Sequence, residues 1–326
     1  MKILITGGTG SIGEGVLRVL LEDPKISEVI VLSRDEFKQC QLRAAIKSPK
    51  LRCVLGDIRD RASLIGPFRG VDVVFHAAAL KHVDLGELMP EEFVKTNILG
   101  SMNVFDVAEE VGVKKVILLS TDKAAHATSV LGMTKGIAER LMIAHAHNNS
   151  KTTFCAVRLG NVLVSRGSVV PIFVEAIKNR GVIAITDPKM TRFVLSLSEC
   201  SEFIKFALEP GKQGDIFIKK CNVMEIGILA RAILGIFKSD IPIKIIGRRE
   251  GERVHEILAN QTELSQSEDM DGYYRISNLL DKDISVKSST INEDYSSETT
   301  RPLTLEETTK ALLALDYIQN EIKETF

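Results

Sequence analysis

The stretch that decides the fold is Thr6-Gly7-Gly8-Thr9-Gly10-Ser11-Ile12-Gly13. It follows a β-branched apolar run at Lys2–Thr6 and opens a helical apolar pattern at Ile12–Leu21. Small residues here permit a tight turn and let the backbone approach a pyrophosphate at the positive end of a helix. A glycine triplet alone is weak evidence, but the strand–turn–helix context favours a dinucleotide site over a structural turn. The cofactor contacts predicted from this loop are Gly7, Thr9, Gly10, Ser11, Ile12 and Gly13.

Outward from this loop, the first 160 residues alternate short β-rich runs with helical patterns, which is typical of an α/β fold with a doubly wound parallel sheet. The runs are nearly continuously apolar, as expected for strands covered on both faces. Strands are predicted over residues 2–6, 28–33, 52–55, 71–76, 115–120 and 153–159. Helices are predicted over residues 12–21, 37–46, 61–65, 91–111 and 129–147.

After residue 160 the alternation becomes irregular, which indicates a smaller lobe facing the carboxyl ends of the parallel strands. We expect a Rossmann domain over 1–160, mainly a substrate-binding lobe over 161–268, and an extended polar tail over 269–326. The tail ends in an amphipathic helix over 305–323, which must pack on its own body or on a neighbouring subunit. In the lobe, helices are predicted over 168–180, 198–208 and 224–237, and strands over 182–185 and 241–246.

Composition excludes several classes of protein. The net charge of −1 provides no field that favours nucleic acid or a membrane surface. No apolar run approaches the roughly 20 residues that cross a bilayer, and the chain enters a strand at once, so we expect a cytoplasmic protein. The five cysteines form no CxxC pair and the six histidines show no ligand spacing, so neither a disulfide framework nor a metal site is expected.

The end of the second predicted strand indicates which dinucleotide is bound. An acidic residue there favours NAD, whereas a cation suits the 2′-phosphate of NADP. The chain has Ser33-Arg34-Asp35, with Lys38 one turn later, so Arg34 favours NADP while Asp35 keeps NAD open. Solvated surface cations are the alternative interpretation of Arg34 and Lys38. Further cofactor contacts are predicted after the third and fourth strands, at Asp57, Ile58, Ala77, Ala78 and Ala79.

The reaction centre is predicted after the fifth strand, at Thr121, Asp122 and Lys123. In the short-chain dehydrogenase pattern a Tyr lies four residues before a Lys and ten after a Ser or Thr. Leu131 occupies that position between Thr121 and Lys135. Leucine has no acidic proton, so Asp122 and Lys123 are the candidate acid and base. An ordinary ion pair at a strand end is the alternative.

Two further residues support this centre. Lys135 shares a helix face with Leu131 and is predicted to bond the nicotinamide ribose. Asn97 is polar within an apolar helical pattern, which suggests a kink or a water-holding residue.

These motifs, with Ala79-Leu80-Lys81-His82-Val83 and Arg158-Leu159-Gly160-Asn161-Val162, resemble the extended short-chain dehydrogenases/reductases. Within that superfamily, Ser165–Pro171, Met190–Phe193 and Gly251–Glu256 resemble the inverting UDP-N-acetylglucosamine 4,6-dehydratases of polysaccharide and capsule biosynthesis. The resemblance covers essentially the whole chain. Some members keep Tyr at the position of Leu131, and the capsular branch commonly has Met there.

The resemblance implies a lyase with an internal redox cycle that consumes no nicotinamide. Hydride leaves carbon 4 of the sugar for NADP⁺, the resulting ketone acidifies carbon 5, and hydride returns to carbon 6 after water is lost. It assigns Asp122 as the acid for the carbon-6 hydroxyl and Lys123 as the base at carbon 5. A lysine needs a lowered pKa for that role, and we expect Lys81 and Lys135 to supply the cations that lower it.

The resemblance also implies a nucleotide-sugar partner, UDP-N-acetylglucosamine, and a homo-oligomer of between two and six subunits. Arg192 and Arg249 correspond to positions near the diphosphate, and Glu252 to one that takes ribose hydroxyls. The other implied contacts are Lys81 (to cofactor and substrate), His82, Arg158, Asn161, Arg166, Gly167, Ser168 and Thr191, with Asn97 on the cofactor side.

Two alternatives remain open from the sequence. A nucleotide-sugar 4-epimerase or reductase would share the dinucleotide loop, although such enzymes depend on the Tyr that is replaced here. A catalytically impaired NADP-binding regulatory protein would also account for Leu131. The retained Asp122, Lys123 and Lys135 favour an enzyme.

Overall fold

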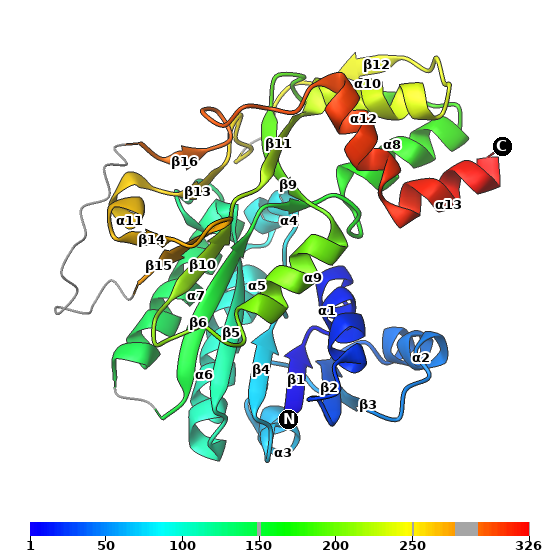
Figure 1. Ribbon diagram of the computed structural model, residues 1–326. Helices are drawn as coiled ribbons and strands as arrows, with labels where there is room; N and C mark the ends of the chain where they lie inside the picture. The colour runs from blue at the N-terminus through cyan, green and yellow to red at the C-terminus, as the bar shows by residue number, and fades with distance from the viewer. Residues whose placement is uncertain (149–150, 250, 278–292, 326) are drawn as a thin grey trace.

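The molecule is built on a nine-stranded sheet with the order β14-β15-β10-β6-β5-β4-β1-β2-β3, seen in the computed structural model of Figure 1. The structure describes residues 1–148, 151–249, 251–277 and 293–325, so residues 278–292 of the predicted tail lie outside it. In this sheet the seven neighbouring strands β3, β2, β1, β4, β5, β6 and β10 run parallel to one another. Strand β15 pairs antiparallel with β10, and β14 pairs antiparallel with β15. The strands are β1 (Lys2–Thr6), β2 (Glu28–Ser33), β3 (Leu51–Leu55), β4 (Val73–His76), β5 (Lys115–Thr121), β6 (Thr153–Leu159), β10 (Ile216–Lys219), β14 (Ser267–Asp269) and β15 (Tyr273–Ile276).

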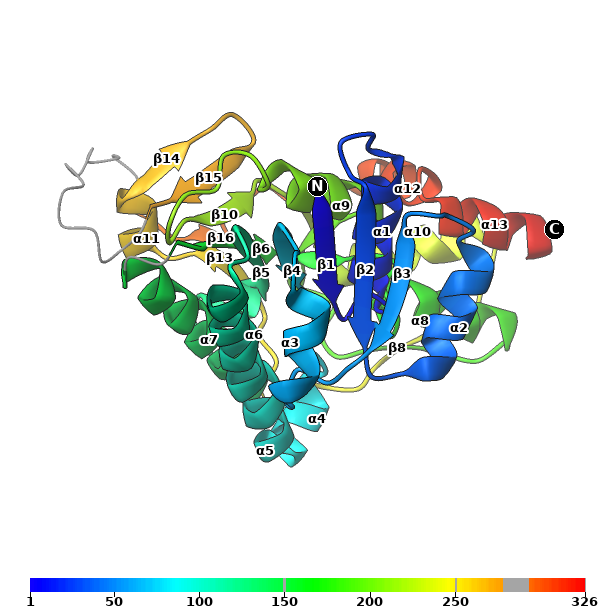
Figure 2. The same ribbon diagram turned by 90° about the horizontal axis from the view of Figure 1, so that it is seen from below.

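Helices cover both faces of this sheet, as Figure 2 shows. One face carries α3 (Ala62–Phe68), α6 (Gly100–Val111) and α7 (Val130–His147). The other carries α1 (Ser11–Glu22) and α9 (Leu197–Phe206), while α2 (Glu36–Ala45) packs beside the β3 edge. The α/β fold with a doubly wound sheet is therefore confirmed, and its apolar strands are buried because both faces are covered.

A smaller lobe lies above the carboxyl ends of the strands and has its own core. Short strands form it: β7 (Asn161–Val162), β9 (Thr191–Leu195) and β11 (Asn222–Glu225) in one sheet, and β8 (Ile183–Ile185) with β12 (Ile243–Ile245) in another. Its helices are α8 (Val169–Lys178), α10 (Ile226–Ile236), α12 (Leu305–Leu313) and α13 (Asp316–Thr325). The amphipathic tail thus packs on its own body through buried Leu312 and Ile318, and it forms two helices where one was predicted.

The main sheet does not stop at residue 160. Strands β10, β14 and β15 come from later residues, and α9 packs against α1. A parallel strand can join an existing edge wherever the chain returns to it, so β10 pairs with β6 across a long crossover. The predicted boundary at 160 therefore does not separate two sheets in space.

The helical pattern at 91–111 is divided into three parts. These are α5 (Pro90–Phe93), a π-helical turn η1 (Val94–Leu99) and α6. The structure also contains α4 (Val83–Leu88), a 3₁₀ turn η2 (Asp122–Ala124), α11 (Gln261–Ser265), and the paired strands β13 (Ile257–Ala259) and β16 (Tyr295–Ser296). Among the described residues no helix is long and apolar enough to span a membrane.

Candidate active site

A cavity of about 1240 Å³ opens where the carboxyl ends of the parallel strands face the smaller lobe. In an open α/β sheet this edge is where ligands bind. Most of the predicted site residues line it: Gly7, Thr9, Gly10, Ser11, Ile12, Gly13, Ser33, Arg34, Lys38, Asp57, Ile58, Ala77, Ala78, Ala79, Lys81, His82, Thr121, Asp122, Lys123, Leu131, Lys135, Asn161, Arg166, Gly167, Ser168, Arg192, Arg249 and Glu252. Asn97, Arg158 and Thr191 are not among its lining residues.

The glycine loop leaves no room for side chains. Gly7 has a left-handed φ of 69°, and a Cβ added there would lie 2.7 Å from the Cα of Ala78. A Cβ added at Gly13 would lie 2.6 Å from the Gly7 carbonyl oxygen. Helix α1 begins behind this loop, and its N-cap residue, Gly10, makes no side-chain capping bond. The first N–H groups of a helix have no intrahelical partners, so they are available to an anion in the cavity.

A buried polar network braces this loop from behind. His76 contacts the hydroxyl of Thr6 at 2.7 Å and that of Ser101 at 2.9 Å, and the Ala78 N–H donates to Thr6 at 3.2 Å. Burial, together with the charge of Lys135, lowers the pKa of His76 to about 3, so the imidazole is neutral. His76 therefore ties β1, β4 and α6 together beneath the dinucleotide loop.

Asn97 braces the next loop rather than lining the cavity. Its Nδ2 donates to the Leu80 carbonyl at 3.1 Å and to the Thr134 hydroxyl at 3.1 Å, and its Oδ1 accepts from the Leu80 N–H at 2.9 Å. It lies in the π-helical turn η1, and such turns recur at functional sites because they re-aim side chains. The predicted kink is thus a π-turn, and no water is needed to satisfy this amide.

The far end of the cavity is rich in cations. Asp35 caps α2 by accepting from the Lys38 N–H at 2.9 Å and pairs with Lys38 Nζ at 2.9 Å. Arg59 forms a close ion pair with Asp57 at 2.7 Å, and Arg34 lies 3.7 Å from the same carboxylate. Burial raises the pKa of Asp57, but the Arg59 hydrogen bonds outweigh it and the pKa is lowered overall.

A loop of the smaller lobe closes over the dinucleotide loop. The Arg166 guanidinium donates to the Thr9 carbonyl at 2.8 Å, and the Arg166 N–H donates to the Ser11 hydroxyl at 3.0 Å. Lys81 in turn donates to the Arg166 carbonyl at 2.6 Å. These bonds hold the two loops predicted to contact cofactor and sugar against each other.

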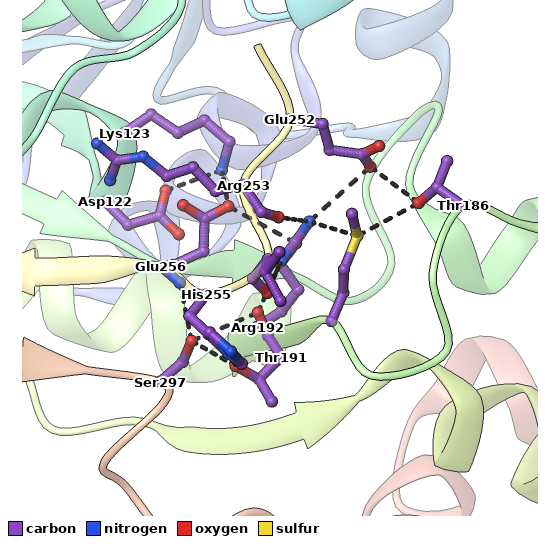
Figure 3. A network of polar contacts seen from close by, with 12 residues as sticks. Asp122, Lys123, Thr186, Thr191, Arg192, Glu252, Arg253, His255, Glu256 and Ser297 are labelled. Atoms are coloured by element: carbon purple, nitrogen blue, oxygen red, sulfur yellow. Dashed lines mark hydrogen bonds and ion pairs between the residues drawn. The ribbon is translucent and has the colours of Figure 1, made fainter. Parts of the chain in front are cut away.

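The predicted acid and base lie together where β5 ends (Figure 3). Lys123 Nζ lies 3.0 Å from Asp122 Oδ1 and 3.2 Å from Glu256 Oε1. The Thr121 hydroxyl donates to Asp122 Oδ1 at 2.8 Å, and Arg192 Nε lies 3.6 Å from Glu256 Oε1. The Asp122 and Glu256 side chains are almost fully buried, whereas 22% of the Lys123 side chain is exposed.

These positions set the directions of the pKa shifts. Burial and the Glu256 charge raise the pKa of Asp122, which favours the protonated acid, although Lys123 opposes them. Burial lowers the pKa of Lys123, but the charges of Asp122 and Glu256 outweigh it and the pKa is raised. Burial raises the pKa of Glu256, but Lys123 and Arg192 outweigh it and the pKa is lowered.

The expectation that Lys81 and Lys135 lower the pKa of Lys123 is therefore wrong. The cation beside Lys123 is Arg192, and two carboxylates outweigh it. Both Lys81 and Lys135 have a lowered pKa themselves: burial and the Arg166 charge lower that of Lys81, and burial brings that of Lys135, whose Nζ donates to the Leu119 carbonyl at 2.6 Å, to about 8. Lys135 shares the cavity wall with Leu131, which is 5% exposed.

Two predicted substrate residues have structural contacts instead. The buried Arg158 guanidinium pairs with Glu139 and Glu263, each at 2.7 Å, and donates to the Leu258 carbonyl. Thr191 contacts His255 and Ser297 through its hydroxyl, at 2.8 and 2.7 Å. Both side chains are occupied by contacts within the protein, and neither lines the cavity.

Residues that sequence reasoning gave no role also line the cavity, above all Glu256, with Arg59 and Arg253. Glu256 is the last residue of the Gly251–Glu256 motif, so that motif was the sequence signal that pointed to it. Its contact with Lys123 could not be predicted, because the two residues are far apart in sequence. Outside the cavity, His145 contacts Glu109 at 2.7 Å and Asp106 at 3.6 Å, as an interhelical pair between α6 and α7.

A family model described as polysaccharide biosynthesis protein matches residues 3–278 of this chain. The chain belongs to this polysaccharide biosynthesis protein family. The family places it among the extended short-chain dehydrogenases/reductases that act on nucleotide sugars, as the sequence predicts.

Relatives of this family member support the assignment. A protein of Rickettsia bellii (strain RML369-C) named UDP-glucose 4-epimerase is 44% identical over 334 residues, with 98% of each chain covered. The X-ray structure of Pen from Bacillus thuringiensis is 35% identical, with a TM-score of 0.90 and 96% of each chain covered. The dTDP-glucose 4,6-dehydratase DesIV of Streptomyces venezuelae, solved with NAD and TYD, is 24% identical with a TM-score of 0.70 over 78% of this chain and 87% of its own. That last likeness shows the fold alone.

Proposed function

We propose that this protein is an NADP-dependent, carbon-5-inverting 4,6-dehydratase of UDP-N-acetylglucosamine that serves surface polysaccharide synthesis. The observation that carries the proposal is the buried Asp122, beside Lys123 and Glu256, in a cavity where leucine replaces the usual tyrosine. Loss of water from a sugar needs an acid at one carbon and a base at its neighbour. Three ionisable groups at one point meet that need.

The cavity residues fit a nicotinamide dinucleotide. The glycine loop, in which a Cβ added at Gly7 or Gly13 would clash with the backbone, and the uncapped start of α1 suit its diphosphate. A bound nicotinamide would supply the hydride acceptor for carbon 4 of the sugar and the hydride donor for carbon 6. The residues that would hold it are those of the loop, with Arg34 and Lys38 at one end and Lys135 at the other.

NADP is favoured over NAD by the state of Asp35. Its carboxylate already caps α2 and pairs with Lys38, so it is engaged by partners other than a ribose hydroxyl. Arg34 and Lys38 are half exposed beside it, and Arg59 completes a group of cations that suits a 2′-phosphate.

Asp122 supplies the proton to the departing carbon-6 hydroxyl, because burial favours its protonated form. Lys123 removes the carbon-5 proton, for which it must first lose a proton of its own. Thr121 orients the Asp122 carboxyl by donating to Oδ1. Arg192, Arg249 and Glu252 line the lobe side of the cavity and would hold the nucleotide of the substrate.

The second candidate is a nucleotide-sugar 4-epimerase, and the names of the Rickettsia relatives support it more directly than they support the dehydratase. Both reactions begin with oxidation at carbon 4. They differ in the fate of the keto sugar, since an epimerase returns hydride to carbon 4 and has no use for an acid at the carbon-6 hydroxyl. The third candidate, a catalytically impaired NADP-binding regulator, would perform neither step.

Proton NMR in heavy water separates these candidates. The purified protein is incubated with UDP-N-acetylglucosamine or UDP-glucose without added reductant. A dehydratase yields a 4-keto-6-deoxy sugar with deuterium at carbon 5, whereas an epimerase yields the 4-epimer with no deuterium. Formation of the epimer alone would overturn the dehydratase, and bound NADP with no turnover would leave only the regulator.

A further inference from the structure

Lys123 must lose a proton before it can act as a base, and the Glu256 carboxylate lies 3.2 Å from its Nζ. We propose that Glu256 is the proton acceptor for Lys123 in the substrate-bound enzyme. This inference rests on the dehydratase function proposed above. Because Glu256 acts through Lys123, it is a positioning residue rather than a group that handles the sugar.

The geometry places the lysine between two carboxylates with different tasks. Lys123 Nζ contacts one oxygen of each, Asp122 Oδ1 at 3.0 Å and Glu256 Oε1 at 3.2 Å (Figure 3). The second oxygens, Asp122 Oδ2 and Glu256 Oε2, are both buried without a hydrogen-bond partner among the described residues. Each carboxyl group thus keeps one oxygen free for a proton.

The surroundings shift the pKa values of the two carboxyl groups in opposite directions. Burial and the charge of Glu256 raise the pKa of Asp122, which favours its protonated form. Lys123, Arg192 and Arg253 hold down the pKa of Glu256, so it stays ionised and can accept one. The two arginines face Glu256 from β9 and from the loop before β13, and they remain charged throughout.

Glu256 is held rigidly enough for this task. Its backbone N–H donates to the Ser297 hydroxyl at 2.8 Å, and its carbonyl accepts from the Ser297 N–H at 2.8 Å. Ser297 also contacts Thr191 on β9. The carboxylate is thereby fixed to the smaller lobe, while Lys123 belongs to the main sheet.

The proposed step moves one proton and conserves charge. An N–H bond of the Lys123 ammonium breaks and an O–H bond forms on Glu256, so a cation and an anion become an amine and a carboxylic acid. In the substrate-free protein mutual attraction keeps the pair charged. A nucleotide sugar that covers the cavity excludes water, and loss of water disfavours both charges. Substrate binding therefore creates the base, which then takes the carbon-5 proton.

The test compares Glu256→Gln with Glu252→Gln, a carboxylate of the same lobe that lies 3.8 Å from Arg192 and binds the Thr186 hydroxyl. For Glu256→Gln we expect kcat at pH 7 to fall by about 10²-fold or more with little change in KM, as for loss of one proton-transfer group. The kcat should recover about tenfold per pH unit as Lys123 deprotonates to solvent instead. Glu252→Gln should raise KM and show no such recovery.

Two measurements keep the result interpretable. Lys123→Arg keeps the ion pairs but cannot lose its proton, so it should be as inactive as Lys123→Ala. Acetic anhydride labelling of Lys123, followed by mass spectrometry across pH, reports the amine without turnover and should begin at lower pH in Glu256→Gln than in wild type.

Unchanged labelling, a kcat that is retained, or a fall in kcat without pH recovery would overturn the inference. If wild type makes no keto sugar but the labelling shift is present, the pairing stands and the dehydratase function fails. If Glu256→Gln does not fold, Glu256→Asp takes its place, with a smaller fall in kcat and the same recovery.

Discussion

Leu131 lies buried in the cavity wall and has no proton to exchange, so acid–base chemistry there falls to charged side chains. Asp122, Lys123 and Lys135 are predictable from sequence because they follow one strand and open one helix. The direction of the pKa shifts of Asp122 and Lys123 is not, because it depends on burial and on Glu256, which the loop before β13 places beside them. The residue types identify the candidate acid and base groups. Their protonation depends on burial and neighbouring charges, which come from packing.

His76 predicts a pH dependence of stability. Its pKa is lowered to about 3 in the folded protein from 6.5, so only the unfolded chain takes up a proton between those values. The stability contribution is complete above pH 6.5 and is lost as the pH falls towards 3. His76→Gln keeps polar contacts with Thr6 and Ser101 but cannot titrate.

Urea unfolding from pH 7 to pH 4 checks this prediction. We expect the wild type to lose about 3 kcal/mol more than His76→Gln over that range. Equal losses in the two proteins would show that His76 is not kept neutral by the fold.

Elements of the main sheet are predictable because each carries its own periodic pattern. The strands from residue 2 to residue 159 are confirmed with bounds that differ by at most two residues. The short strands of the lobe, such as β7 and β16, have two residues each and no periodicity. These strands form only because distant parts of the chain pair with them. The ion pairs of Arg158 likewise depend on distant residues.

Arg158 joins β6 to α7 and α11 through Glu139 and Glu263. Arg158→Ala leaves two carboxylates buried without their cation, so it should lower the free energy of unfolding by about 3–5 kcal/mol. The control is Arg301→Ala, which breaks an exposed pair with Glu307 and should leave unfolding unchanged within error. Thermal unfolding of both variants checks this, and similar behaviour of the two would contradict the structural role of Arg158.

Over the whole molecule, apolar side chains are exposed on the adjoining helices α4 to α7. Leu88 is 75% exposed, Met133 52% and Ile137 46%, although all three are large and apolar. Exposed apolar side chains on adjoining helices are typical of an interaction surface, and the homo-oligomer implied by the resemblance would place a second copy there. We therefore propose that this face joins two subunits.

Light scattering during gel filtration measures the mass directly. Met133→Glu with Ile137→Glu should convert a dimer or larger assembly into smaller units, because two charges per subunit would be buried at the contact. Leu305→Glu, at an exposed position of α12, is the control and should keep the mass of the wild type. A wild type that runs as a monomer would contradict the proposed contact.

The backbone clasp between Glu256 and Ser297 also has a consequence for biosynthesis. The glycine loop and the strands from β1 to β6 are translated well before Ser297. Glu256 acquires its backbone anchor only after the ribosome has added Ser297. We therefore expect a chain that ends just before Ser297 to contain the glycine loop but to lack the backbone bonds that anchor Glu256.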